Sequence, residues 1–211
     1  MQRVLARTPR QIEYVRLLRN KNVPIVVAHG PAGCGKTMLA THVGIEAFEQ
    51  GSVNRLVFSR PAVCSDEQHG FLPGTLEEKM SPWVRPIMDA MRVHWSEKEI
   101  RRLTADGRIE FAPLAFMRGR TFRESWVVCD EAQNCTKNQV LMVLTRIGEG
   151  SKIVLTGDLE QHDHKIDSGL RDLVWRLDRT HDDDIGLVSF EAKDVQRHPI
   201  IPKVIALYEN S

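Results

Sequence analysis

Eight consecutive residues near the N-terminus have the types and spacing needed to bind the phosphates of a nucleotide. The segment fits the pattern G-x-x-x-x-G-K-[ST] and runs through Gly30, Pro31, Ala32, Gly33, Cys34, Gly35, Lys36 and Thr37. Glycines leave backbone N–H groups free to face a phosphate, Lys36 reaches the β- and γ-phosphates, and the Thr37 hydroxyl binds Mg²⁺. The segment lies between a strand-like run and a helical pattern, as the motif requires. This context favours a nucleotide-phosphate site over a glycine-rich turn that matches by chance.

Two adjacent carboxylates follow an apolar run in the middle of the chain. Residues 126–129 predict a buried strand that delivers Asp130 and Glu131 to its end, in the form of a Walker B motif. Asp130 is expected to hold Mg²⁺ through water, and Glu131 to polarise an attacking water molecule. The second carboxylate favours hydrolysis over transfer to the hydroxyl of a small molecule. The pair could also cap a helix that begins at Asn134 or Thr136, and the two roles are compatible.

A third polar segment, residues 157–161, follows another strand-like run. Gln161 carries both a donor and an acceptor, so it is a candidate sensor of the γ-phosphate or of its attacking water. An ordinary polar loop is the other interpretation. The sequential order of the three motifs favours the sensor.

Strand-like and helix-like segments alternate along the chain, which is typical of an α/β fold with a mainly parallel sheet and helices on both faces. The expected strands lie at residues 23–28, 55–59, 126–130, 152–156 and 185–190, and the expected helices at 36–50, 75–105, 137–147 and 201–208. Ligands of open α/β sheets bind at the carboxyl ends of the strands, so the three polar loops should converge there. No repeat or linker divides the chain. We therefore expect one domain over residues 1–211, with an N-terminal segment 1–22 and a core 23–211.

The composition excludes several classes of protein. The chain has 211 residues, of which 42% are hydrophobic, and 29 Lys+Arg stand against 28 Asp+Glu, so disorder through excess charge does not fit. No apolar stretch reaches the ~18 residues of a spanning helix, and the N-terminus lacks the apolar centre of a signal peptide, so we expect a cytoplasmic protein without a membrane partner. The four cysteines lack zinc or redox spacing and are expected to be reduced thiols. His162, Asp163 and His164 could hold a metal but are more typical of a polar loop.

Longer motifs accompany these segments. They are Ser59-Arg60-Pro61-Ala62-Val63, Gly70-Phe71-Leu72-Pro73-Gly74, Phe116-Met117-Arg118-Gly119-Arg120-Thr121-Phe122 and Asp130-Glu131-Ala132-Gln133-Asn134. With them, the chain resembles the PhoH family over residues 8–208. That family is similar to the first RecA-like domain of superfamily-one helicases and is associated with ATP binding and RNA-related roles. The resemblance implies a single RecA-like P-loop NTPase domain that uses ATP and Mg²⁺.

The resemblance also implies roles for two residues outside these segments. Gln11 is similar to the glutamine that reads the adenine edge in such helicases, because an amide pairs with both N6 and N7 of adenine. An ordinary exposed helix residue is the other interpretation. Arg197 is similar to a late helicase arginine that contacts the γ-phosphate, and a surface salt bridge is its alternative.

Three arginines are candidates for contacts with nucleic acid. Arg60, Arg118 and Arg120 can each bind a phosphate in bidentate geometry, and the last two flank a glycine that lets backbone approach. They could instead reach the nucleotide of a neighbouring subunit or form internal ion pairs. The net charge of +1 neither supports nor excludes a nucleic-acid partner.

The resulting hypothesis is a Mg²⁺-dependent ATPase in which Lys36, Glu131, Gln161 and Arg197 act on ATP. A superfamily-one helicase uses two RecA-like domains and only one is expected here, so a homo-oligomer, for example a ring, or another partner should complete the site. The enzyme would remodel RNA or a ribonucleoprotein. The rival hypothesis is a nucleotide-gated binding module that recruits a protein partner with little or no hydrolysis. A small-molecule phosphotransferase is disfavoured because the sequence has no arginine-rich lid.

Overall fold

A single parallel β-sheet forms the centre of the molecule. The computed structural model describes residues 6–61, 76–161, 167–180 and 182–196. Within these ranges, six strands pair in the order β3-β2-β4-β5-β1-β6, and every pairing is parallel. The strands are β1 (Ile25–His29), β2 (Arg55–Arg60), β3 (Ile109–Pro113), β4 (Ser125–Cys129), β5 (Lys152–Gly157) and β6 (Ile185–Ser189).

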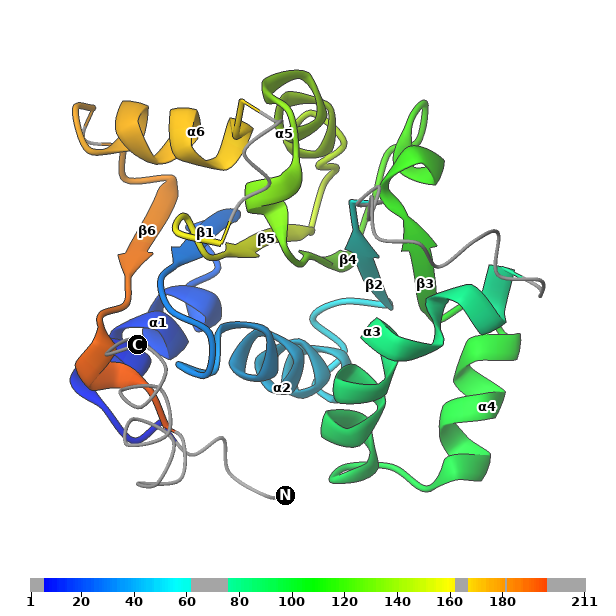
Figure 1. Cartoon of the computed structure of the whole chain (residues 1–211). Helices are drawn as coiled ribbons and strands as arrows, with labels where there is room; N and C mark the ends of the chain where they lie inside the picture. The colour runs from blue at the N-terminus through cyan, green and yellow to red at the C-terminus, as the bar shows by residue number, and fades with distance from the viewer. Residues whose placement is uncertain (1–5, 62–75, 162–166, 181, 197–211) are drawn as a thin grey trace, which may run out of the picture.

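Helices cover both faces of this sheet, as Figure 1 shows. One face carries α1 (Pro9–Arg19), α2 (Lys36–Glu49), α3 (Leu76–Arg92) and α4 (Glu97–Ala105). The other carries α5 (Lys137–Leu144), α6 (Gly169–Leu177) and the 3-10 turn η1 (Leu114–Met117). Two further 3-10 turns, η2 (Ala132–Asn134) and η3 (Ala192–Asp194), follow β4 and β6. The predicted α/β fold, with a parallel sheet and helices on both faces, is confirmed.

The central strands bury both of their faces, because each face packs on helices. Along β1, Val26 and Ala28 belong to the core under α1–α4, whereas Val27 belongs to the core under α5 and α6. All residues of β4 and β5 are buried, which explains why they read in the sequence as continuous apolar runs. None of the helices in the described ranges is long and apolar enough to cross a membrane.

The helix that follows the phosphate loop packs directly on the sheet at a glycine. Gly44 of α2 faces the ring of Trp126 in β4, and a Cβ added at Gly44 would lie 2.6 Å from that ring. Only a glycine allows this approach, since real side chains do not come so near. The contact sets the height of α2 above β4 and therefore the position of Lys36 relative to the end of β4.

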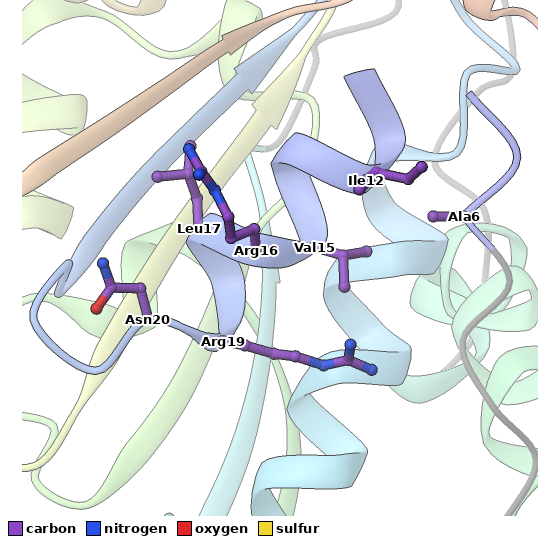
Figure 2. Close-up of a pocket in the computed structure, with 7 residues that line it drawn as sticks. All are labelled: Ala6, Ile12, Val15, Arg16, Leu17, Arg19 and Asn20. Carbon is purple, nitrogen blue, oxygen red and sulfur yellow. The ribbon is translucent and has the colours of Figure 1, made fainter. Parts of the chain in front are cut away.

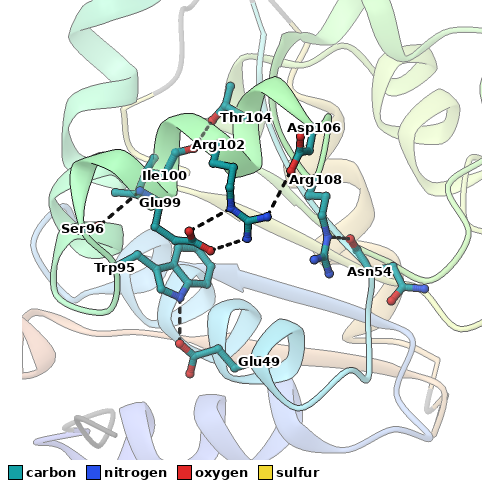
Figure 3. Close-up of polar contacts among 10 residues, drawn as sticks. All are labelled: Glu49, Asn54, Trp95, Ser96, Glu99, Ile100, Arg102, Thr104, Asp106 and Arg108. Carbon is teal, nitrogen blue, oxygen red and sulfur yellow. Dashed lines mark hydrogen bonds and ion pairs between the residues drawn. The ribbon is translucent and has the colours of Figure 1, made fainter.

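The structure differs from the predicted elements at one helix and contains others that were not predicted. The expected helix at 75–105 is two helices: the turn after Arg92 ends α3, and the Ser96 hydroxyl accepts from the Glu99 N–H at 3.3 Å to begin α4. Figure 3 shows this cap, together with the bond from the Trp95 indole to Glu49 of α2 at 3.0 Å. The prediction also missed α1, α6 and β3. A strand at the sheet edge that contains Glu110 and ends at Pro113 gives only a weak apolar signal. The predicted helix at 201–208 lies outside the described residues.

Candidate functional site

Three loops meet at the carboxyl edge of the sheet. The strands that precede them, β1, β5 and β4, are immediate neighbours, with β5 in the middle. The Gly30 N–H donates to the Gly157 carbonyl at 3.1 Å, which joins the loop after β1 to the end of β5. The Asp130 N–H donates to the Ser59 carbonyl at 2.9 Å, which joins the ends of β4 and β2. The convergence expected from the sequence is therefore present.

The phosphate loop uses glycine conformations that other residues rarely adopt. Gly30, Gly33 and Gly35 have φ values of 137°, 90° and 84°. At Gly30 a Cβ would also lie 2.4 Å from the Phe190 carbonyl oxygen, so no side chain fits there. Gly35 is the N-cap residue of α2, and the loop thus leads directly into the positive end of a helix dipole. Such a loop fits the phosphates of a nucleotide.

Lys36 lies across the inside of this loop. Its Nζ donates to the carbonyls of Gly30 at 2.6 Å and Pro31 at 2.9 Å, and the side chain is almost fully buried. The Cys34 sulfur is 3.6 Å away, and burial raises the pKa of this thiol, which opposes formation of a thiolate. The ammonium is therefore held where the loop closes on itself, surrounded by backbone groups and without a carboxylate partner among the described residues.

Three oxygen atoms form a compact cluster beside Lys36. Asp130 Oδ1 accepts from the Thr37 hydroxyl at 2.7 Å and from the Thr156 hydroxyl at 2.6 Å. The three residues come from α2, the end of β4 and the end of β5. Hydroxyl and carboxylate oxygens are the hard ligands that Mg²⁺ prefers, and Mg²⁺ keeps several waters besides one or two protein ligands. The donor set therefore fits Mg²⁺.

Glu131 adopts a strained backbone conformation directly after this cluster. Its φ of 54° lies in the left-handed region, and within the described residues only Glu124 is another non-glycine residue with a positive φ. Such strain persists where surrounding contacts hold it and is concentrated at functional sites. One contact is with Arg60, whose Nη2 lies 3.9 Å from Glu131 Oε1. The carboxylate is partly exposed and so remains accessible to water.

Gln133 connects Glu131 to the loop after β5, a role that the sequence did not suggest. Its Nε2 donates to Glu131 Oε2 at 2.5 Å and to the Gln161 carbonyl at 3.4 Å. Its Oε1 accepts from the Asp158 N–H at 3.1 Å. Gln133 is 1% exposed, and its contact with the Asp158 N–H is buried, whereas Glu131 at the other end is partly exposed. The only sequence signal was its place in the motif of residues 130–134.

Gln161 lies at the exposed end of the third loop. Its N–H donates to the Asp158 carbonyl at 3.2 Å, and its own carbonyl accepts from Gln133. The loop is therefore fixed through its backbone, and the Gln161 side chain is exposed at the same edge of the sheet as Glu131. This position is compatible with the sensor role that the sequence suggested.

Gln11 is buried against the phosphate loop and is not an ordinary exposed helix residue. It is 2% exposed, its Nε2 donates to the Cys34 carbonyl at 3.0 Å, and its Oε1 accepts from the Arg7 N–H at 2.7 Å. Both ends of the amide are thus occupied inside the protein. To read an adenine edge, Gln11 would exchange at least one of these partners for the base. In the structure described here, it ties the start of α1 to the loop.

The three candidate arginines have different surroundings. Arg120 forms a two-pronged ion pair with Glu110, at 2.6 and 2.8 Å, which matches the internal alternative considered from the sequence. This pairing raises the pKa of Arg120 and lowers that of Glu110. Arg60 faces Glu131, whereas Arg118 is exposed.

Several predicted positions lie outside the described residues. They are Arg197, the 70–74 motif, Cys64 and the segment 162–164. The residue before Arg197 is described: the Gln196 N–H donates to the Gly33 carbonyl at 3.0 Å, so the chain contacts the phosphate loop at that point. The cysteines that are described, Cys34, Cys129 and Cys135, are free thiols.

A hollow of ≈ 880 Å³ lies along α1, away from the phosphate loop. Figure 2 shows that its lining side chains leave the helix in different directions and do not converge on one point. The lining residues are Ala6, Ile12, Val15, Arg16, Leu17, Arg19 and Asn20. They offer no combination of nucleophile, base and acid, so the candidate site remains the edge formed by the three loops.

Comparison with known proteins gives consistent matches. A family described as "PhoH-like protein" matches residues 3–209. The chain is 40% identical to "PhoH-like protein" from Bacillus subtilis over 98% of its own length and 64% of that protein. It is 45% identical to "PhoH-like protein" from Mycobacterium tuberculosis H37Rv over 87% of its length and 52% of that protein. It is 36% identical to "Protein PhoH" from Escherichia coli K12 over 97% of its length and 58% of that protein. The chain thus spans about half to two thirds of these curated relatives.

Proposed function

The chain belongs to the PhoH family, and from that premise we propose that it is a Mg²⁺-dependent, ATP-binding ATPase. The observation that carries the proposal is the direct contact of Asp130 with Thr37 and Thr156, beside the buried Lys36 and the accessible Glu131. A turn that matched the phosphate-loop pattern by chance would not have a carboxylate from a distant strand on its threonine. The cluster has the parts that phosphoryl transfer to water needs.

Each residue has a distinct task in the proposed reaction. The backbone N–H groups of the phosphate loop and the Lys36 ammonium neutralise the β- and γ-phosphates. Thr37 and Asp130 supply oxygen ligands, and Mg²⁺, when bound there, neutralises phosphate charge. Glu131 accepts a proton from the attacking water. Gln133 orients the Glu131 carboxylate through the 2.5 Å hydrogen bond. Gln161 senses the γ-phosphate from the neighbouring loop.

Two further residues are proposed to bind the adenine base and to stabilise charge on the γ-phosphoryl group. Gln11, beside the loop, is our candidate for preferring ATP over GTP. Arg197 is our candidate for stabilising charge on the γ-phosphoryl group, within its own subunit or across an interface. In the second case the active form is a homo-oligomer, for example a ring, since one subunit's arginine completes the next subunit's site.

RNA or a ribonucleoprotein is the proposed target of ATP turnover, with Arg60, Arg118 and Arg120 as candidate contacts. The rival proposal is a binding module that changes its affinity for a protein partner when ATP binds and hydrolyses little of it. The accessible Glu131 beside the Mg²⁺ ligands favours hydrolysis. Phosphate release by the purified chain with Mg-ATP and no added acceptor distinguishes the two.

Three variants test the assignment. Lys36→Ala is expected to lose tight Mg-ATP binding, because the loop then lacks the charge that offsets the phosphates. Glu131→Gln should keep binding, measured with a fluorescent ATP analogue, and lose about 10²–10⁴-fold in single-turnover hydrolysis. Glu160→Gln is the matched control, because Glu160 is an exposed carboxylate on the adjoining loop, and it should behave as wild type.

Two results would contradict the proposal. Hydrolysis at the wild-type rate by Lys36→Ala would remove the site, and equal losses in Glu131→Gln and Glu160→Gln would remove the role of Glu131. Native mass measurement with and without ATP tests the oligomer. Mixing Lys36→Ala with Arg197→Ala chains should restore activity only if Arg197 acts across an interface.

A further inference from the structure

An exposed aromatic residue stands on a rigid support just beyond β3. The 3-10 turn η1 begins directly after Pro113, and its end residues Leu114 and Met117 are buried at 2% and 0% exposure. Between them, Phe116 is 59% exposed. Gly119 follows with a φ of 76° and no atom near its Cβ position, so the surface beside the turn is open. Phe116 therefore presents its ring to solvent from a fixed backbone.

Arginines follow Phe116 in the chain, and their partners differ. Arg118 is exposed and, within the part of the chain that the structure describes, has no carboxylate partner. Arg146 donates to the Arg120 carbonyl at 3.2 Å and to the Thr145 hydroxyl, while its Nε is buried without a hydrogen-bond partner in the same ranges. Arg120 is balanced by Glu110. Arg118, two residues after Phe116, thus carries an exposed guanidinium charge that no described carboxylate pairs with.

We propose that Phe116 and Arg118 form a platform for single-stranded nucleic acid, with one base stacked on the ring and its phosphate on the guanidinium. Stacking on an aromatic side chain suits any unpaired base, whereas a duplex hides its base faces. Arginine supplies the phosphate contact that makes such binding strong and salt-dependent. Within η1, the large side chains beside Phe116, Leu114 and Met117, are buried, so this turn offers a protein partner little apolar area beyond the one ring.

The platform is connected to the candidate ATPase site. Pro113, which precedes η1, is paired with Arg60 across the β2–β3 ladder, and Arg60 Nη2 lies 3.9 Å from Glu131. Nucleic acid held at η1 therefore lies one β-strand away from Arg60, the arginine that faces Glu131, our candidate general base. This platform deepens the proposed function: its biological role rests on the proposed ATPase, although nucleic-acid binding itself requires no ATP.

Another exposed aromatic residue, Trp175 of α6, serves as a matched control. It is 52% exposed, but Arg179 already covers its ring at 4.1 Å. Its helix also carries Asp172, and Asp178 follows directly after it, which disfavours phosphates. Figure 1 places α6 and β3 at opposite ends of the sheet. Binding by η1 and binding by α6 can therefore be told apart.

The test measures fluorescence anisotropy of a labelled oligouridine without nucleotide, with oligothymidine and a hairpin duplex as further arms. Phe116→Ala should weaken binding of the single strand by about 5- to 150-fold, the loss of one stacked base, and Phe116→Tyr should restore it. Arg118→Gln should weaken binding and reduce its salt slope by about one ion. Trp175→Ala should bind as wild type. The uridine and thymidine arms decide between RNA and DNA.

Three outcomes would overturn the platform. They are equal affinities of Phe116→Ala and wild type, a larger loss in Trp175→Ala, and tighter binding of the duplex than of the single strand. A wild-type chain that binds no strand would also end the inference, while leaving Lys36-dependent ATP hydrolysis intact. Conversely, strand binding that depends on Phe116 would survive a failure to hydrolyse ATP.

Discussion

Replacing Gln133 by leucine removes the central contact between Glu131 and the loop after β5. Leucine has a similar size and keeps the space between η2 and β5 filled, so the change is confined to hydrogen bonds. The variant loses three hydrogen bonds. Gln133 Nε2 no longer donates to Glu131 Oε2 at 2.5 Å or to the Gln161 carbonyl at 3.4 Å, and its Oε1 no longer accepts from the Asp158 N–H at 3.1 Å.

The expected cost follows from the burial of the partners. Asp158 is 7% exposed, so its N–H has no access to replacement water, and an orphaned buried donor costs about 1–3 kcal/mol. The Glu131 carboxylate is 36% exposed and regains water, so it adds little. A chain of this size loses roughly 2–4 °C of melting temperature per kcal/mol, and Gln133→Leu should melt roughly 2–12 °C lower.

Activity should change separately from stability. With Glu131 no longer oriented, single-turnover hydrolysis at a temperature where the variant is folded should fall, while Mg-ATP affinity stays near wild type. Gln139→Leu is the control: Gln139 Oε1 accepts from the Thr136 N–H at 2.8 Å in an exposed capping box, and water can replace it, so its loss should cost only a few tenths of a kcal/mol. A Gln133→Leu chain that melts and hydrolyses like this control would refute the reasoning.

Two further predictions concern the fold. Gly44→Ala should lower the free energy of unfolding in urea by about 1–3 kcal/mol, because its Cβ would lie 2.6 Å from the Trp126 ring. Gly51→Ala is the control: nothing lies within 4 Å of its Cβ position, so it adds no such contact and introduces only the backbone strain of a φ of 69°. Lys152, buried beneath α1, has its pKa lowered from 10.5 to about 8 by burial. The unfolded chain holds this proton longer, so unfolding free energy should rise between pH 8 and 10.5 by up to ~1.4 kcal/mol per unit, relative to Lys152→Met. Equal pH slopes in the two proteins would contradict the second prediction.

The sequence alone predicted several of the residues that the candidate site contains. The phosphate loop, Asp130 and Glu131 each depend on a few consecutive residues whose backbone conformation and strand context are set locally. The central strands were also predictable, because both of their faces are buried and continuous apolar runs result. The edge strand β3 was missed, since Glu110 pairs with Arg120 there and interrupts the apolar pattern.

Only the tertiary structure decided which side chains meet. That Gln133 holds both Glu131 and Asp158, and that Gln11 is buried on the phosphate loop, depends on strand order and helix packing across long stretches of chain. Neither residue differs in type from an ordinary polar surface residue. Likewise, Phe116 reads in the sequence as one more apolar residue, and it is exposed because Leu114 and Met117, on either side, take the buried positions of η1. Residue type determines what a side chain can do, but contacts between segments distant in sequence determine what it faces.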